Sequence, residues 1–177
     1  MKKIVIVNGL IGGAIVASVM LATMGMFCQS GNFEAGMIVG YSTMIVAFSL
    51  VFVGIKNYRD KYNNGVISFG KAFTIGILIT LIASTIYVIA WMIDFHFFIP
   101  DFGEKYAAAM LAKAKAGGAS EAEMVKQTAD MASFLEMYKN PVAVALFTYL
   151  EILPVGLLIT IVSSLILKRK AKPAVNQ

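Results

Sequence analysis

Charged residues are scarce in this 177-residue chain: they make up 14% of it, whereas 59% of the residues are hydrophobic. A soluble domain has about 25% charged residues, so the composition argues against one. With one Cys and one His, the sequence offers neither an internal disulfide nor the spaced ligands of a zinc site. It also lacks GxSxG, Walker, HExxH and dinucleotide-binding glycine patterns. We therefore expect no enzyme, no cofactor and no bound metal.

The sequence instead contains four long runs of uncharged, mostly apolar residues, the last of them interrupted only by Glu151. A helix of about 20 residues crosses a hydrocarbon core of about 30 Å. The first run follows Lys2 and Lys3, but it is longer than a signal-peptide core and has no A-x-A site, so we expect a retained helix. The sequence predicts an all-α membrane four-helix bundle, one domain over 1–177, with spans at about 4–27, 35–55, 70–94 and 141–167.

The connections differ in length, and the longest, residues 95–140, is predicted to be an extracytoplasmic helical insertion. An Ala-rich helix is expected over 105–116, Gly117 and Gly118 end it, and the capping box of Ser120 and Glu123 begins another. Each helix has an apolar stripe, which predicts that the two pack as a hairpin or lie on the membrane interface. The stripes are Phe102, Tyr106 and Met110, and Met124, Thr128, Met131, Leu135 and Tyr138. The segment 56–65 is expected to be a water-exposed loop.

The charges predict an orientation. With the N-terminus in the cytoplasm, the cytoplasmic side receives Asp60 and ten basic residues: Lys2, Lys3, Lys56, Arg59, Lys61, Lys71, Lys168, Arg169, Lys170 and Lys172. The other side receives eight acids and only five lysines: Glu34, Asp94, Asp101, Glu104, Glu121, Glu123, Asp130 and Glu136, with Lys105, Lys113, Lys115, Lys126 and Lys139. The positive-inside rule therefore predicts that both termini are cytoplasmic. The basic residues that give the net charge of +5 form collars at helix ends, where they would bind anionic lipid headgroups. We therefore expect the lipid bilayer and no nucleic acid as a partner.

Small residues recur at every fourth position within the spans, a spacing that lets helix backbones approach closely. The glycines in these stripes are Gly9, Gly13, Gly36, Gly40, Gly76 and Gly156. Packing within one bundle is the interpretation we favour, and contacts in a homo-oligomer are the alternative.

Three ionisable residues lie within or at the ends of the spans, where charge is costly and often functional. Glu151 lies one turn before Pro154, and Asp94 and His96 lie at the end of the third span. One hypothesis joins all three in a proton- or cation-binding cluster. In the other, Asp94 and His96 reach the headgroups while Glu151 is protonated or paired with Lys139 or a Tyr.

Soft ligands near the end of the first span offer a weaker hypothesis. Met20, Met24, Met26 and Cys28 are the residue types that bind copper(I). The sequence has eleven methionines, however, and apolar packing accounts for most of them.

The sequence combines a basic stretch at 57–60, a segment at 67–76 that opens the third span, the long helical connection, and a last span that ends in Lys-Arg-Lys at 168–170. In this combination it resembles the domain of unknown function 4199 family of bacterial membrane proteins. The resemblance implies a location in the bacterial cytoplasmic membrane and brings no catalytic residues with it.

Two functions follow as expectations. The first is a non-enzymatic membrane component whose extracytoplasmic segment contacts a membrane protein partner or the membrane surface. The alternative is a small oligomeric channel or transporter that uses Asp94, His96 and Glu151.

Overall fold

The computed structural model describes residues 1–170, and within them the chain is all-helical, as the sequence predicts. Its helices are α1 (Lys2–Ser30), α2 (Phe33–Tyr62), α3 (Phe69–Phe97), α4 (Phe102–Ala116), α5 (Glu121–Tyr138) and α6 (Pro141–Leu167). Four of them, α1, α2, α3 and α6, are long and apolar enough to cross a membrane. The only extended pairing in the described part is an isolated antiparallel bridge between Ile67 and Arg169.

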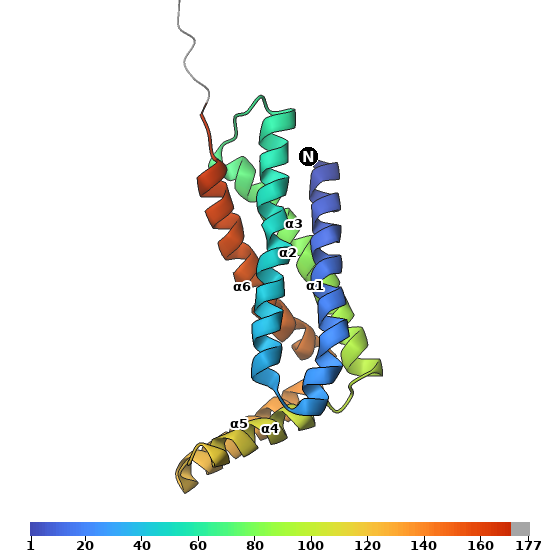
Figure 1. Ribbon diagram of the computed structural model, residues 1–177, viewed down its shortest axis with the longest axis vertical. Helices are drawn as coiled ribbons and strands as arrows, with labels where there is room; N and C mark the ends of the chain where they lie inside the picture. The colour runs from blue at the N-terminus through green and yellow to red at the C-terminus, as the bar shows by residue number, and fades with distance from the viewer. Residues whose placement is uncertain (171–177) are drawn as a thin grey trace, which may run out of the picture.

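The four long helices form a bundle with α4 and α5 at one end, here called the hairpin end (Figure 1). The opposite end, called the terminal end, carries the N-terminus, the α2–α3 connection and the end of α6. The bridge fastens this end, since Ile67 and Arg169 exchange two backbone hydrogen bonds of 3.0 and 2.8 Å. Lys172, predicted to lie on the same side, is outside the described residues.

Helix α2 continues about two turns further than expected, through the basic segment to Tyr62, so the prediction of a loop over 56–65 is wrong for most of its length. Lys and Arg are good helix formers and no Gly or Pro interrupts them, so the helix continues as long as the backbone allows. It stops where Asn64 and Gly65 adopt left-handed φ values of 50° and 75°.

The bundle has α1 and α6 at opposite corners, because α1 packs mainly on α2 and α3 while α6 packs on the same two helices. Glycines make the closest approaches. A Cβ at Gly9 would lie 2.7 Å from Cβ of Ile82 on α3, and one at Gly76 would lie 2.7 Å from Cγ2 of Thr160 on α6. A Cβ at Gly13 would likewise meet α3, 2.6 Å from Cδ1 of Ile86.

Polar groups accompany the α3–α6 contact near the middle of the bundle. The hydroxyls of Thr80 and Thr160 are 3.1 Å apart, and Thr80 donates to the backbone carbonyl of Gly156 at 3.4 Å. Both threonines are fully buried, so hydrogen bonding to each other and to the backbone replaces the water they lose. This contact closes the half of the bundle nearer the terminal end.

Helices α4 and α5 pack against each other and project to one side across the hairpin end (Figure 1). The turn between them includes Gly118 with φ of 78°, and the predicted capping box is present: Ser120 accepts from the Glu123 amide while the Glu123 carboxylate accepts from the Ser120 amide. The expected stripe of α5 is half-buried at Met124, Met131, Leu135 and Tyr138. Thr128, assigned to the same stripe, is exposed, and its hydroxyl donates to the Met124 carbonyl at 2.8 Å.

Candidate cavity at the hairpin end

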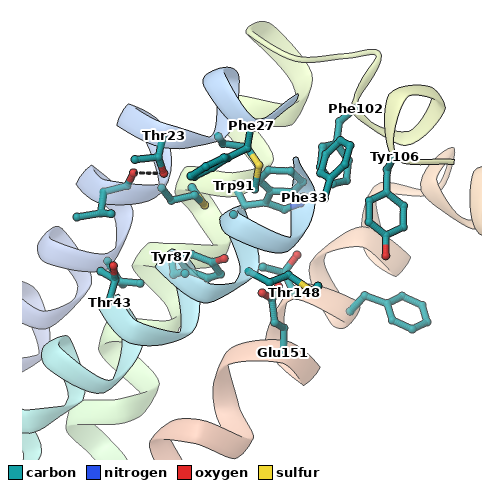
Figure 2. A pocket seen from close by; sticks show the side chains of 18 of the residues that line it. Thr23, Phe27, Phe33, Thr43, Tyr87, Trp91, Phe102, Tyr106, Thr148 and Glu151 are labelled. Carbon is teal, nitrogen blue, oxygen red and sulfur yellow. Dashed lines mark hydrogen bonds between the residues drawn. The ribbon is translucent and has the colours of Figure 1, made fainter. Parts of the chain in front are cut away.

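A cavity of about 380 Å³ lies in the bundle at the hairpin end, where the diagonal helices α1 and α6 leave space between them (Figure 2). All six helices contribute to its wall. Its lining residues are Val16, Val19, Met20, Thr23, Met24, Phe27, Phe33, Gly36, Met37, Gly40, Thr43, Tyr87, Trp91, Phe102, Tyr106, Met131, Phe134, Tyr138, Phe147, Thr148 and Glu151.

One of the stripe glycines, Gly40, belongs to this wall and not to a close helix contact, since a Cβ there would have no atom within 4 Å. Gly36 also lines the cavity, but a Cβ there would lie 3.2 Å from the Phe27 ring, so α1 and α2 approach closely at this glycine. The packing role expected for Gly40 therefore does not hold in this bundle, unlike that of Gly9, Gly13, Gly36, Gly76 and Gly156. Gly40 instead keeps the α2 wall of the cavity open.

Aromatic rings close the cavity beneath the hairpin. Phe102 begins α4 and lies edge-on to Trp91 of α3, with centroids 4.8 Å apart, and edge-on to Phe33 of α2, at 5.9 Å. Phe134 and Tyr138 of α5 continue the cluster, with centroids 4.4 Å apart. Edge-to-face pairs of this kind add about 0.5–1.5 kcal/mol each beyond the area they bury. They dock the hairpin onto the bundle.

Three threonine hydroxyls at the wall are already engaged. Thr23 donates to the carbonyl four residues earlier at 2.8 Å, Thr43 does the same at 2.7 Å, and Thr148 at 2.8 Å. Such bonds satisfy the hydroxyl inside its own helix. What remains free to interact with an occupant, among the described residues, is the Glu151 carboxylate, the phenols of Tyr87, Tyr106 and Tyr138, and the indole N–H of Trp91, while the threonine oxygens can still accept a hydrogen bond.

Glu151 is exposed at the cavity wall and is its only charged lining residue. It takes part in none of the ion pairs or side-chain hydrogen bonds of residues 1–170. The partner suggested by the sequence, Lys139, binds Glu136 at 2.7 Å instead, because both lie at the end of α5 on adjacent turns. That part of the prediction is wrong.

Two tyrosines lie near this carboxylate. Burial raises the pKa of the Tyr138 phenol, and the neighbouring Glu151 raises it further. Figure 2 shows the Tyr87 side chain extending into the cavity toward the side where Glu151 lies. Phenols that stay protonated can donate hydrogen bonds to a carboxylate or to a ligand bound beside it.

Asp94 and His96 do not join Glu151 at the cavity. Two residues apart on α3, they face different directions, so Asp94 is buried while His96 is exposed with its ring edge-on to Phe97. The buried Oδ2 of Asp94 has no hydrogen-bond partner within the described part of the chain. Nowhere in residues 1–170 do three His, Cys, Asp or Glu side chains gather as metal ligands.

The soft ligands of α1 also point in different directions. Met20 and Met24 line the cavity, whereas Met26 is largely exposed and Cys28 is buried outside the lining. A helix separates residues at such spacings over more than one face, and a copper(I) site at all four is not assembled.

The sequence pointed to Glu151 but not to the rings around it. Phe27, Phe33, Tyr87 and Trp91 are spread over α1, α2 and α3, and no sequence motif distinguishes them from the other apolar residues of these helices. Only their positions could have indicated the site: each lies in the half of its helix nearer the hairpin, so their rings can surround one cavity.

Comparison with known proteins gives a family and no activity. No curated protein and no solved structure matches the chain. The family model described as "Protein of unknown function (DUF4199)" matches residues 8–169, which include most of α1, all of α2, α3 and α6, the hairpin and every lining residue of the cavity. The resemblance seen in the sequence is thus confirmed, and the chain belongs to the DUF4199 family.

Proposed function

We propose that this protein is a non-enzymatic, multi-pass component of the bacterial cytoplasmic membrane that acts by binding a ligand at its extracytoplasmic end. The observation that carries the proposal is the cavity beneath the hairpin, which combines an apolar wall with a single carboxylate. Ligand sites in proteins are typically of this kind, mostly apolar with a few placed polar groups.

The lipid bilayer is the first partner in this proposal. Large apolar side chains are exposed on all four long helices, for example Ile6, Ile38, Ile89 and Leu158. Soluble monomers rarely expose contiguous apolar surface beyond a few hundred Å². A membrane protein partner or a second copy would have to compete with lipid for the same faces.

The proposed orientation places the terminal end in the cytoplasm and the hairpin outside. Basic residues surround the terminal end, while the hairpin end includes most of the acids. This asymmetry supports the proposal through the positive-inside rule.

Cysteine labelling tests the orientation. In a Cys28→Ala background, Lys61→Cys marks the terminal end and Ala116→Cys marks the hairpin, and both positions are exposed. A membrane-impermeant maleimide should label Ala116→Cys in intact cells and Lys61→Cys only after permeabilisation. The reverse pattern would refute the orientation.

Ligand binding itself is tested by what the protein retains on purification. Gly40→Leu should fill the cavity without a clash, because a Cβ there meets no atom within 4 Å. Gly25→Leu is the matched control, since its Cβ position is equally free and Gly25 does not line the cavity. Mass spectrometry of small molecules extracted from the purified proteins should find a species with wild type and Gly25→Leu that Gly40→Leu lacks. Identical extracts from all three would contradict the proposal.

A small channel or transporter is the second candidate, favoured by Glu151, which lies about 15 Å from the start of α6 at 1.5 Å per residue. The close α3–α6 packing at Gly76, Thr80, Gly156 and Thr160 argues against a continuous pathway through this one chain. Flux measurements in proteoliposomes over a range of pH and cations decide the matter: flux above empty vesicles that Glu151→Gln abolishes would establish transport.

A further inference from the structure

We propose that the cavity binds an amphipathic organic cation, with the positive charge at Glu151 and the apolar body among the aromatic rings under the hairpin. This inference rests on the proposed function, since it names the chemical class of the ligand. It joins three observations: the charge of the wall, its aromatic composition, and the small number of its hydrogen-bonding groups.

The charge of the wall selects the sign of the ligand. Within residues 1–170, Glu151 is the one charged residue that lines the cavity, and none of their Lys or Arg side chains lines it to receive an anion. A carboxylate in an apolar membrane environment is costly unless a cation accompanies it. Because no basic side chain of residues 1–170 pairs with Glu151, a bound cation would be its natural counterion.

The aromatic wall favours the same class. Nine of the lining residues are Phe, Tyr or Trp, drawn from all six helices. Their ring faces attract cations, most strongly at Trp, at sites kept free of water. Trp91 and Phe102 hold each other at 4.8 Å and so present a fixed surface on which an organic cation can lie.

The hydrogen-bonding inventory disfavours a sugar or another polyhydroxylated ligand. The three threonine hydroxyls give their protons to backbone carbonyls and can only accept, so the tyrosine phenols and the Trp91 indole N–H are the donors of a wall that is otherwise apolar apart from Glu151. A ligand whose polar groups outnumber these partners would leave the excess unsatisfied, at a cost of about 1–3 kcal/mol each. The body of the ligand must therefore be apolar.

The size and lining of the cavity favour compact ligands and allow their shape to vary. Its volume of about 380 Å³ is near the lower end of the range for small-molecule sites. Four methionines, Met20, Met24, Met37 and Met131, line it, and their flexible side chains adapt to ligands of different outline.

Two probe ions of nearly equal size and opposite charge test the assignment: tetraphenylphosphonium and tetraphenylborate. The protein reports on itself, because Trp91 is its only tryptophan and lines the cavity. The purified full-length protein in a nonionic detergent is titrated with each ion while tryptophan emission is followed. Tetraphenylphosphonium should change the emission saturably, with an affinity at least tenfold higher than that of tetraphenylborate.

Paired variants separate charge from space. Glu151→Gln should weaken phosphonium binding at least tenfold, whereas Glu104→Gln, the same change at an exposed residue outside the lining, should leave it unaltered. Gly40→Leu should abolish the saturable signal, and Gly25→Leu should retain it. In each pair the same substitution is made once in the cavity lining and once outside it, so the two variants differ only in the position of the change.

The outcomes distinguish this inference from the proposed function. If tetraphenylborate binds as tightly as its cationic counterpart, or if Glu151→Gln binds phosphonium normally, the cavity is an apolar site and the cation assignment is overturned. If Gly40→Leu affects neither ion, the cavity is not a binding site and both proposals fail.

Discussion

Replacing Gly156 with alanine should destabilise the protein, although alanine is the better helix former. A Cβ at this position would overlap Cγ2 of Thr80 and lie 2.9 Å from Cζ of Phe48. Neither neighbour can withdraw: Phe48 is 1% exposed, and Thr80 is held by the Thr160 hydroxyl at 3.1 Å. The helices α3 and α6 must therefore move apart.

The magnitude follows from opposing terms. Overpacking a tight interior site costs about 1–3 kcal/mol, and a site that cannot relax belongs near the upper end. Moving α6 away also breaks the bond from Thr80 to the Gly156 carbonyl, worth about 1 kcal/mol. The alanine gains about 1 kcal/mol in helix propensity. We expect a net loss of about 2–3 kcal/mol in the free energy of unfolding.

Gly40→Ala is the control, since it makes the same substitution in another span where the new Cβ meets nothing. It should stabilise the protein by about 0.5–1 kcal/mol. Reversible unfolding in mixed micelles, followed by circular dichroism against the mole fraction of denaturing detergent, measures both. Equal stability of Gly156→Ala and Gly40→Ala would refute the packing argument.

Three further predictions concern the hairpin. Phe102→Ala should release it from the bundle at a cost of about 3–5 kcal/mol and shift Trp91 emission to longer wavelength, whereas Phe98→Ala, at an exposed ring, should do neither. Hydrogen bonds from Ser120 hold the pKa of Glu123 below its ordinary value of 4.5. Their contribution to stability is therefore complete at neutral pH and is lost as the pH falls through the lowered pKa. In Ser120→Ala the titration of Glu123, followed by NMR, should move to higher pH, and an unchanged midpoint would count against the capping box. The exposed ion pair of Lys113 and Glu34 should contribute less than about 1 kcal/mol in a double-mutant cycle, and a larger coupling would show that it anchors the hairpin.

The spans were predictable because length and the absence of charge define them without any knowledge of packing. Absence of charge places the end of the second span at residue 55, because Lys56 and Arg59 follow it and are then assigned to a loop. Hydropathy reports where a helix leaves the apolar layer, whereas the backbone signals at Asn64 and Gly65 report where the helix ends. Reading both signals would have placed the boundary correctly.

The candidate site was predictable only in part, for a geometric reason. Glu151 is visible in the sequence because a carboxylate interrupts an apolar run. Grouping it with Asp94 and His96 used their depth along the helices and ignored direction around the helix, which differs by about 200° between residues two apart. The cavity depends on which helices are diagonal neighbours, and no periodicity within one span reveals that.

The two halves of the bundle divide the work between closure and binding. Toward the terminal end, glycines and the Thr80–Thr160 contact bring α3 and α6 together, whereas toward the hairpin end the helices leave the aromatic cavity between α1 and α6. Glu151 lies at the boundary, about one and a half turns from the Gly156 contact. In the proposed function, a cation bound at this carboxylate would lie with its charge at Glu151 and its apolar body toward Phe102 and Tyr138. Passage any deeper would require α3 and α6 to separate, so the residues that pack the terminal half favour a site that holds a ligand over a pathway through this chain.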